Sequence, residues 1–223
     1  EVIAQAKQVY ERFSKEAPQL KLILQTYFEH LISYKAVTEF PVEAIGLDFV
    51  HGDSLELLKE NGFPEDKVLA AGIIDGRNVW TSKLEENLAE LEEIQGYVKK
   101  DTLIVQPSSS LLHVPVTVKL EETLDTGIKS GLAFADEKIT EIITLAKGLS
   151  EGKEKIREEL EENKNQLQQF NESADRINEA VRKEIEQLSE SDAKRSSTFA
   201  ERIQKQEEHL DLPLFPTTTI GSL

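Results

Sequence analysis

Four short, continuous apolar runs constrain the fold of this chain more than any other feature. They cover LKLILQTYF (20–28), AIGLDFV (44–50), VLAAGIID (68–75) and TLIVQPS (102–108). Strands of this composition are buried on both faces, as in a parallel sheet that helices cover. The segments between the runs carry helical patterns, which supply the crossover connections that parallel strands require. The sequence therefore predicts an α/β fold built from about four βα units.

Helix signals define the intervening segments. Apolar residues at helical spacing run from Val2 to Phe13 and stop before Pro18. Further helices are expected between the runs, over 30–38, 53–60 and 82–95. Because the first segment is a helix with no strand before it, the pattern predicts half of an eight-stranded (β/α)8 TIM barrel or a small open sheet.

The pattern changes after Gly148, where Glu, Lys, Gln and Asn fill most positions. Apolar residues recur there at spacings of three, four or seven, with a single gap in the register at Asn163: Ile156, Leu160, Leu167, Phe170, Ala174, Ile177, Val181 and Leu188. This seam predicts a long helical linker arm, either one amphipathic helix or a hairpin, that packs on the βα part or on another chain. N-cap residues at 189–192 predict one more helix, with Phe199 and Ile203 on one face.

Composition narrows the functional classes. The formal net charge of −16 disfavours nucleic acid, because phosphate binding needs clustered Lys and Arg. The absence of cysteine excludes a disulfide framework and a thiolate metal site. No apolar run approaches the length of a membrane span, and residues 1–17 have an amphipathic pattern rather than that of a signal peptide. We therefore expect a cytoplasmic protein with neither a nucleic acid nor a membrane as partner.

Polar side chains follow each apolar run, where a parallel βα barrel binds its ligands. These candidate functional residues are Glu29 and His30, Asp48 and His51, Asp75 through Trp80, and Ser108 through His113. Asp48 and His51 could be a metal pair, although an isolated D-x-x-H is more often a hydrogen-bonded loop. Arg77 and Asn78 could bind a carboxylate or pin neighbouring loops. The loop with three serines and His113 has no G-x-S-x-G elbow and no third member of a triad.

The last residues, LPLFPTTTIGSL (212–223), form a pattern of their own. Two prolines precede a β-branched run, and Gly221 and Ser222 follow it. A β-branched run followed by Gly-Ser predicts a strand that ends in a loop aimed at a ligand. We therefore expect the first strand of a further domain that this chain does not contain.

Four motifs in register resemble the cobalamin-independent methionine synthase family: AAGIIDGRNVW (70–80), PSSSLLHVPV (107–116), LAFADEK (132–138) and LPLFPTTTIGS (212–222). The resemblance runs from about residue 20 to the C-terminus. It implies transfer of a methyl group from 5-methyltetrahydrofolate polyglutamate to homocysteine, by two (β/α)8 barrels joined by a helical connection. It further implies that 1–148 is the C-terminal half of the N-terminal barrel, 149–211 the helical interdomain linker, and 212–223 the first strand of the catalytic barrel. The chain is then a fragment.

The resemblance assigns few functional residues to this chain. Its IGS motif lines the homocysteine site, which implies substrate binding by Ile220, Gly221 and Ser222. A glycine lets backbone amides approach the amino-acid carboxylate, and a serine hydroxyl adds a hydrogen bond.

The resemblance also places the catalytic zinc, its Cys, His and Glu ligands and the acid-base histidine in the second barrel. The fragment alone is then expected to be inactive, to contain no catalytic residue and to bind no metal. The polar residues after the strands become structural residues of a barrel face that no longer holds a metal: His30, Asp48, His51, Arg77, Asn78 and His113.

An alternative is a stand-alone acidic helical interaction module, in which the apolar seam binds a partner helix. A complete interaction module would not be expected to end in the strand-like segment TTTIGSL, so this segment favours the methyltransferase.

Overall fold

The computed structural model describes residues 1–99 and 102–217, except for the side chain of Asp175. The chain divides into two compact units, Glu1–Arg176 and Ile177–Leu223. The first unit contains the sheet and the helices packed on it. The second contains two further helices.

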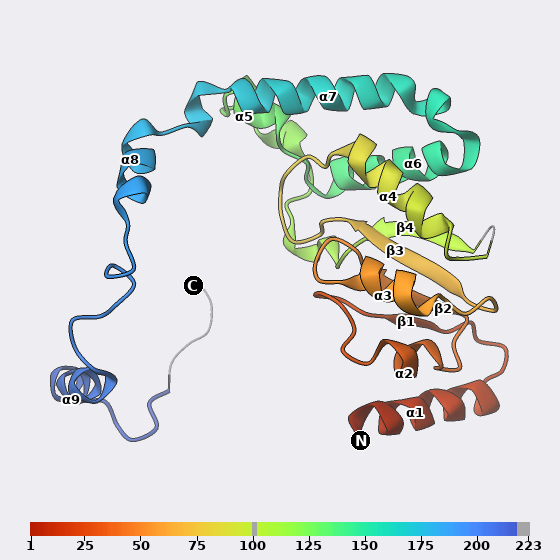
Figure 1. Ribbon diagram of the computed structural model, residues 1–223, viewed down its shortest axis with the longest axis horizontal. Coiled ribbons are helices and arrows are strands. Elements are labelled where there is room, and N and C mark those ends of the chain that lie inside the picture. Colours follow the sequence, from red (N-terminus) through yellow and green to blue (C-terminus); the bar gives the residue numbers. More distant parts are fainter. Residues whose placement is uncertain (100–101, 218–223) are drawn as a thin grey trace. The chain divides into compact units, whose positions relative to one another are not determined.

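A four-stranded parallel sheet forms the centre of the first unit. Its strands are β1 (Ile23–Gln25), β2 (Ala44–Asp48), β3 (Val68–Ile74) and β4 (Leu103–Pro107), and they lie side by side in sequence order (Figure 1). All three pairings are parallel. Since each new strand adds on the same side of the last, right-handed crossovers place the connecting helices on one face, as in a barrel. The predicted α/β fold with four parallel strands is confirmed.

Helices precede or connect these strands close to the predicted positions, except that the helix expected over 30–38 begins only at Tyr34. They are α1 (Val2–Glu16), α2 (Tyr34–Thr38), α3 (Ser54–Asn61) and α4 (Leu84–Gln95). Strand β1 is much shorter than the predicted run over 20–28. The chain leaves the sheet after Gln25 because Phe28 and Glu29 have φ angles of 63° and 82°, which no strand contains.

After β4 the chain forms short turns and then a long helix. The elements are η1 (Leu111–His113), η2 (Val118–Leu120), α5 (Thr126–Ser130) and α6 (Ala135–Glu151). Glu137 fixes the start of α6, because its carboxylate accepts hydrogen bonds from the amides of Phe134 and Val118 and from the Thr117 hydroxyl. Burial raises the pKa of Glu137, but these hydrogen bonds outweigh it and the pKa lies below its usual value.

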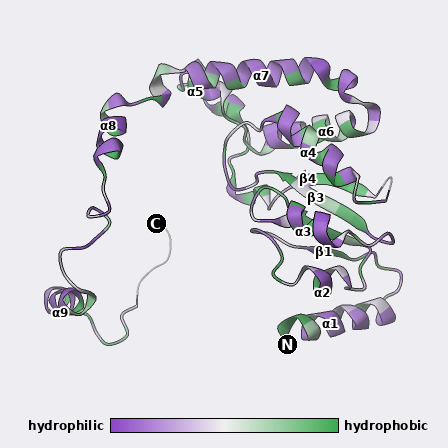
Figure 2. Cartoon of the chain, viewed as in Figure 1, coloured by the Kyte–Doolittle hydropathy of each residue, from purple (hydrophilic) through white to green (hydrophobic). Residues whose placement is uncertain are grey.

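The core lies between the helices and one face of the sheet, and hydrophobic residues are concentrated on the strands (Figure 2). Ile45, Leu47 and Leu69 are at most 1% exposed and pack with helical residues such as Leu91 and Leu145. The other face of the sheet carries mostly small and polar residues, together with the exposed Ile23 and Ile104. The Gln25 amide lies over Gly46, where any Cβ would overlap it, and the Gln106 amide donates to the Ala70 carbonyl (3.2 Å).

Helix α7 (Arg157–Glu172), preceded by η3 (Lys153–Ile156), completes the first unit and contacts α4 and α5. Ile156 is fully buried in the core, and Leu160 is partly buried against it. The predicted seam is therefore packed along this part of the chain.

The seam does not continue as one helix. Helix α7 ends at Glu172, because the next residue, Ser173, has a ψ of 126°, which is not helical. The short helix η4 (Ala174–Arg176) follows. Asn178 then starts α8 (Glu179–Gln187) by accepting hydrogen bonds from the amides of Ala180 and Val181. On this second helix the seam faces solvent, since Val181 is 48% exposed.

The last helix, α9 (Phe199–Leu210), starts later than predicted. The expected cap residues at 189–192 instead form a closed turn, in which the Asp192 carboxylate accepts from the Ser189 amide and hydroxyl. The N-cap residue of α9 is Thr198, which forms a capping box with Glu201. No helix in the described part of the chain is both long and apolar enough to cross a membrane.

The two halves of the seam should differ in their contribution to stability. Ile156→Ala leaves a cavity in the core and should lower the free energy of unfolding by about 2–5 kcal/mol. Val181→Ala on α8, where the side chain is 48% exposed, should change it by less than about 0.5 kcal/mol. Urea denaturation followed by circular dichroism measures both. Equal losses would show that α8 packs as tightly as η3.

Candidate functional site

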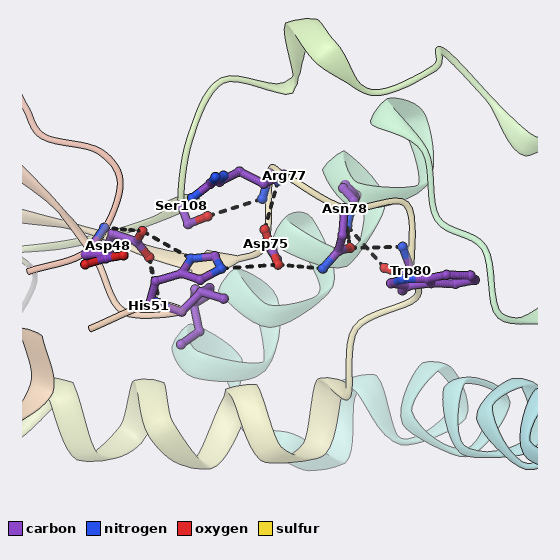
Figure 3. A network of polar contacts seen from close by, with 12 residues as sticks. Asp48, His51, Asp75, Arg77, Asn78, Trp80 and Ser108 are labelled. Atoms are coloured by element: carbon purple, nitrogen blue, oxygen red, sulfur yellow. Dashed lines mark hydrogen bonds and ion pairs between the residues drawn. The ribbon is translucent and has the colours of Figure 1, made fainter. Parts of the chain in front are cut away.

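Polar residues at the carboxyl ends of β2, β3 and β4 meet in one network (Figure 3). Asp48, the last residue of β2, is completely buried. One carboxylate oxygen accepts from the amides of Val50 (2.9 Å) and His51 (3.1 Å), and the other from the amide of Glu29 (3.1 Å). Asp48 therefore ties the loop after β1 to the loop after β2.

His51 joins the ends of β2 and β3. Its Nδ1 lies 3.3 Å from Asp48 Oδ2, and its Nε2 lies 3.8 Å from Asp75 Oδ2 (Figure 3). Its side chain is one-third exposed, so the imidazole lies at the surface of the network. The sequence identified Asp48, His51 and Asp75 as candidates, and the structure brings them together.

Asn78 pins the loop after β3. Its Nδ2 donates to Asp75 Oδ2 (2.5 Å), and its Oδ1 accepts from the Trp80 amide (2.9 Å) and from Lys138 Nζ (3.3 Å). Of the two roles that the sequence left open for Arg77 and Asn78, pinning of the loop is the one that Asn78 performs. Arg77 is exposed and its guanidinium lies 4.9 Å from the centre of the Phe28 ring.

The loop after β4 contributes structural hydrogen bonds. Ser108 Oγ accepts from the Gly76 amide (3.2 Å), which joins β4 to the loop after β3, and Ser110 Oγ caps η1 through the Leu112 amide. His113 is exposed. Within the described residues, no hydrogen bond joins a serine of this loop to a histidine, so the arrangement gives no support for a hydrolase triad.

Glu29 and His30 lie after β1. The Glu29 amide reaches Asp48, as described above, whereas His30 Nδ1 accepts from the Asp53 amide (3.3 Å) at the start of α3. His30 thus joins two loops beside the network.

Three buried polar residues on the helices behind the network were not among the candidates predicted from the sequence. Lys138 and Glu141 of α6 and Asn163 of α7 are buried, and all three bind the segment from Asn78 to Leu84. Charged residues three apart on the buried side of a helix were the available signal for the first two. Asn163 is the one gap in the apolar seam, and a polar residue at such a position signals a buried hydrogen bond.

Burial shifts the pKa values of both charged residues on α6. It lowers the pKa of Lys138, an effect that Glu141 and Asp75 partly offset by their negative charges. It raises the pKa of Glu141, although the hydrogen bonds from Ser82 and the charge of Lys138 act in the opposite direction.

A cavity of about 400 Å³ lies beside the network. It is lined by residues of the loops after β2 and β3 and of α4, among them Val50, Asp75, Trp80, Asn87 and Glu90. Burial raises the pKa of Glu90 and the charge of Glu93 adds to this effect, whereas Lys59 opposes it. The lining of the cavity is about equally polar and apolar, and its volume is enough for several water molecules or a small molecule.

The described residues do not fit a metal. No group of three or more His, Cys, Asp or Glu side chains is arranged to hold one within residues 1–99 and 102–217. Asp48 and His51 are a hydrogen-bonded pair, as the alternative interpretation of D-x-x-H expected. The predicted substrate-binding residues Ile220, Gly221 and Ser222 lie outside the described residues.

The fold and the network define a class of protein, namely α/β proteins whose functional face lies at the carboxyl ends of parallel strands. Residues 1–99 match the family described as "Cobalamin-independent synthase, N-terminal domain". The resemblance stated from four motifs is confirmed, because the N-terminal part of the chain matches this family and relatives named as the methyltransferase align along the whole chain.

Similarity to curated relatives extends along the chain. The 5-methyltetrahydropteroyltriglutamate–homocysteine methyltransferase of Listeria welshimeri is 54% identical over 222 residues, which cover 99% of this chain. The enzymes of the same name from Bacillus subtilis and Lactiplantibacillus plantarum are 48% and 44% identical, over 97% and 95% of this chain. The chain spans 29%, 29% and 28% of the length of these three relatives.

Removing the Asp48 carboxylate should destabilise the strand-end network. Asp48→Ala removes the buried acceptor of three part-buried hydrogen bonds from loop amides and should lower the free energy of unfolding by about 3–5 kcal/mol. Asp53→Ala is the matched control, because that carboxylate is 73% exposed and only approaches His30 at 3.7 Å; it should cost less than about 1 kcal/mol. Urea denaturation measures both, and a similar small loss in each would remove Asp48 from the centre of the network.

Proposed function

We propose that this chain is part of an enzyme that transfers a methyl group from 5-methyltetrahydrofolate, carrying a polyglutamate tail, to homocysteine and so makes methionine. The observation that carries the proposal is the 54% identity over 222 residues with a methyltransferase whose name states this reaction. The reaction class and both substrates follow from that name. A cytoplasmic location fits a biosynthetic enzyme of this kind.

In this proposal the chain supplies the framework around a site that other segments complete. Residues 1–148 are the C-terminal half of an N-terminal (β/α)8 barrel, 149–211 an interdomain helical linker, and 212–223 the first strand of a catalytic barrel. The sequential order of β1 to β4 supports the first assignment, since barrel strands pair with their neighbours in sequence. A chain spanning 29% of its relatives leaves room for the remaining strands in a longer protein.

The proposal assigns homocysteine binding to Ile220, Gly221 and Ser222, and its support is the family resemblance. The proposed enzyme depends on zinc, whose ligands belong to segments outside this chain. That assignment agrees with the absence of cysteine from the sequence. The polar network after β2 to β4 then holds the strand-end loops of the N-terminal barrel in place.

The stand-alone interaction module is the weaker candidate. It would use the exposed part of the seam, Ile177, Val181 and Leu188, to bind a partner helix. Similarity to the methyltransferases covers this stretch as well, because the alignment extends over 99% of the chain.

The substrate assignment can be tested in a polypeptide extended to the length of the relatives. Gly221→Val should place a side chain where the backbone approaches homocysteine, and KM for homocysteine should rise more than about tenfold, or about 1.4 kcal/mol. Ser222→Ala should cost about 1 kcal/mol, the value of one hydrogen bond. Steady-state kinetics with methyltetrahydrofolate held saturating measures both. A normal KM in the Gly221→Val enzyme would remove these residues from the site.

The chain by itself should show neither methyl transfer nor stoichiometric zinc. We expect no methionine from homocysteine and methyltetrahydrofolate, and less than one tightly bound zinc per chain after dialysis against the metal. Mass spectrometry of the products and elemental analysis of the dialysed protein measure these outcomes. Turnover by this chain, or one tightly held zinc per chain, would contradict the assignment of the catalytic residues to other segments.

A further inference from the structure

Three buried polar side chains on two helices hold the backbone of the loop between β3 and α4. Lys138 Nζ donates to the Trp80 carbonyl (3.1 Å), and the Glu141 carboxylate accepts from the Ser82 amide (2.8 Å) and hydroxyl (2.7 Å). Asn163 Nδ2 donates to the Ser82 carbonyl (2.8 Å), and its Oδ1 accepts from the Leu84 amide (3.1 Å). The loop is therefore held at three successive points from outside itself.

Burying these three polar side chains costs free energy. Lys138 is completely buried, and its recorded acceptors, Asn78 Oδ1 and the Trp80 carbonyl, are both neutral. No carboxylate of the described residues lies within 4 Å of its ammonium. Burying a cation or a carboxylate costs free energy that an apolar side chain of similar size would not cost. Fixing one conformation of the loop is the gain that explains their presence.

The loop carries residues that matter for the strand-end face. Asp75 approaches His51, and Asn78 links Asp75 to Lys138. Trp80 is 48% exposed, and its ring lies 5.4 Å from the ring of Phe170 on α7, at an interplanar angle of 36°. Position 131 permits this contact because any Cβ there would overlap Phe170, and the residue is glycine.

We propose that Lys138, Glu141 and Asn163 are positioning residues: they fix the loop from Asp75 to Lys83 so that Asp75 meets His51 and the Trp80 indole is presented at a set place beside the strand-end network. The helices α6 and α7 thereby determine the geometry of a site to which they contribute no exposed group. This role does not depend on the methyl transfer proposed above, since it concerns the loop whatever ligand the face binds.

The chain contains its own reporter, because Trp80 is its single tryptophan. Lys138→Met removes the ammonium donors and nearly keeps the side-chain volume. It should shift the indole emission to longer wavelength and raise the acrylamide quenching constant, by at most about twofold because the indole is already 48% exposed. Lys147→Met is the matched control on the same helix, since that ammonium pairs with Glu159 (3.6 Å) at the surface, and its spectrum should be unchanged.

A conservative pair separates positioning from mere packing. Glu141→Gln keeps an acceptor for the Ser82 amide and should leave the quenching constant near that of the unsubstituted chain, whereas Glu141→Met should raise it as Lys138→Met does. The measurements use the 223-residue chain, at a temperature where circular dichroism shows each variant folded. Should Lys138→Met fail to fold, the Glu141 pair alone decides. Variants that lower the unfolding temperature but leave the emission and quenching of Trp80 unchanged would overturn the proposal.

Discussion

A parallel sheet whose strands follow sequence order is the constraint on which the rest of this structure depends. It brings the carboxyl ends of β2, β3 and β4 to one edge, and that edge is where Asp48, Asp75 and Ser108 lie. Polar side chains there bond to one another and to loop amides, because a buried carboxylate such as that of Asp48 needs hydrogen-bond donors. The completely buried Asp48 carboxylate, with three amide donors, is the strongest example.

The strand-end network and the helices behind it form one connected system. His51 and Asp75 join neighbouring loops, Asn78 links Asp75 to Lys138, and Glu141 and Asn163 hold the following residues. Hydrogen bonds between the loops can maintain this system without a ligand. This agrees with the proposal that the segment supports a methyltransferase site completed elsewhere.

The proposed function rests on similarity to the methyltransferases more than on the chemistry of the residues at this face. The described residues offer neither a metal-ligand group nor a triad, whereas identity to the methyltransferases reaches 54% along the chain. Sequence motifs identified the family because DGRNVW and its companions retain their order and spacing. They did not identify Lys138 and Glu141 as loop-holding residues, because two charged residues three apart on a helix do not show which loop they contact.

The sequence by itself determined the four parallel strands, the helices between them and the polar residues at the strand ends, because local periodicity and burial on both faces specify these features. Only the tertiary structure decided where β1 ends, since Phe28 and Glu29 turn the chain out of the sheet. It likewise divided the expected apolar seam between α7 and α8, which separate at Ser173. It also showed that Asn163, the gap in that seam, accepts a hydrogen bond from the Leu84 amide at the start of α4. These outcomes depend on contacts between residues far apart in sequence, and a repeat pattern read along one segment contains no information about them.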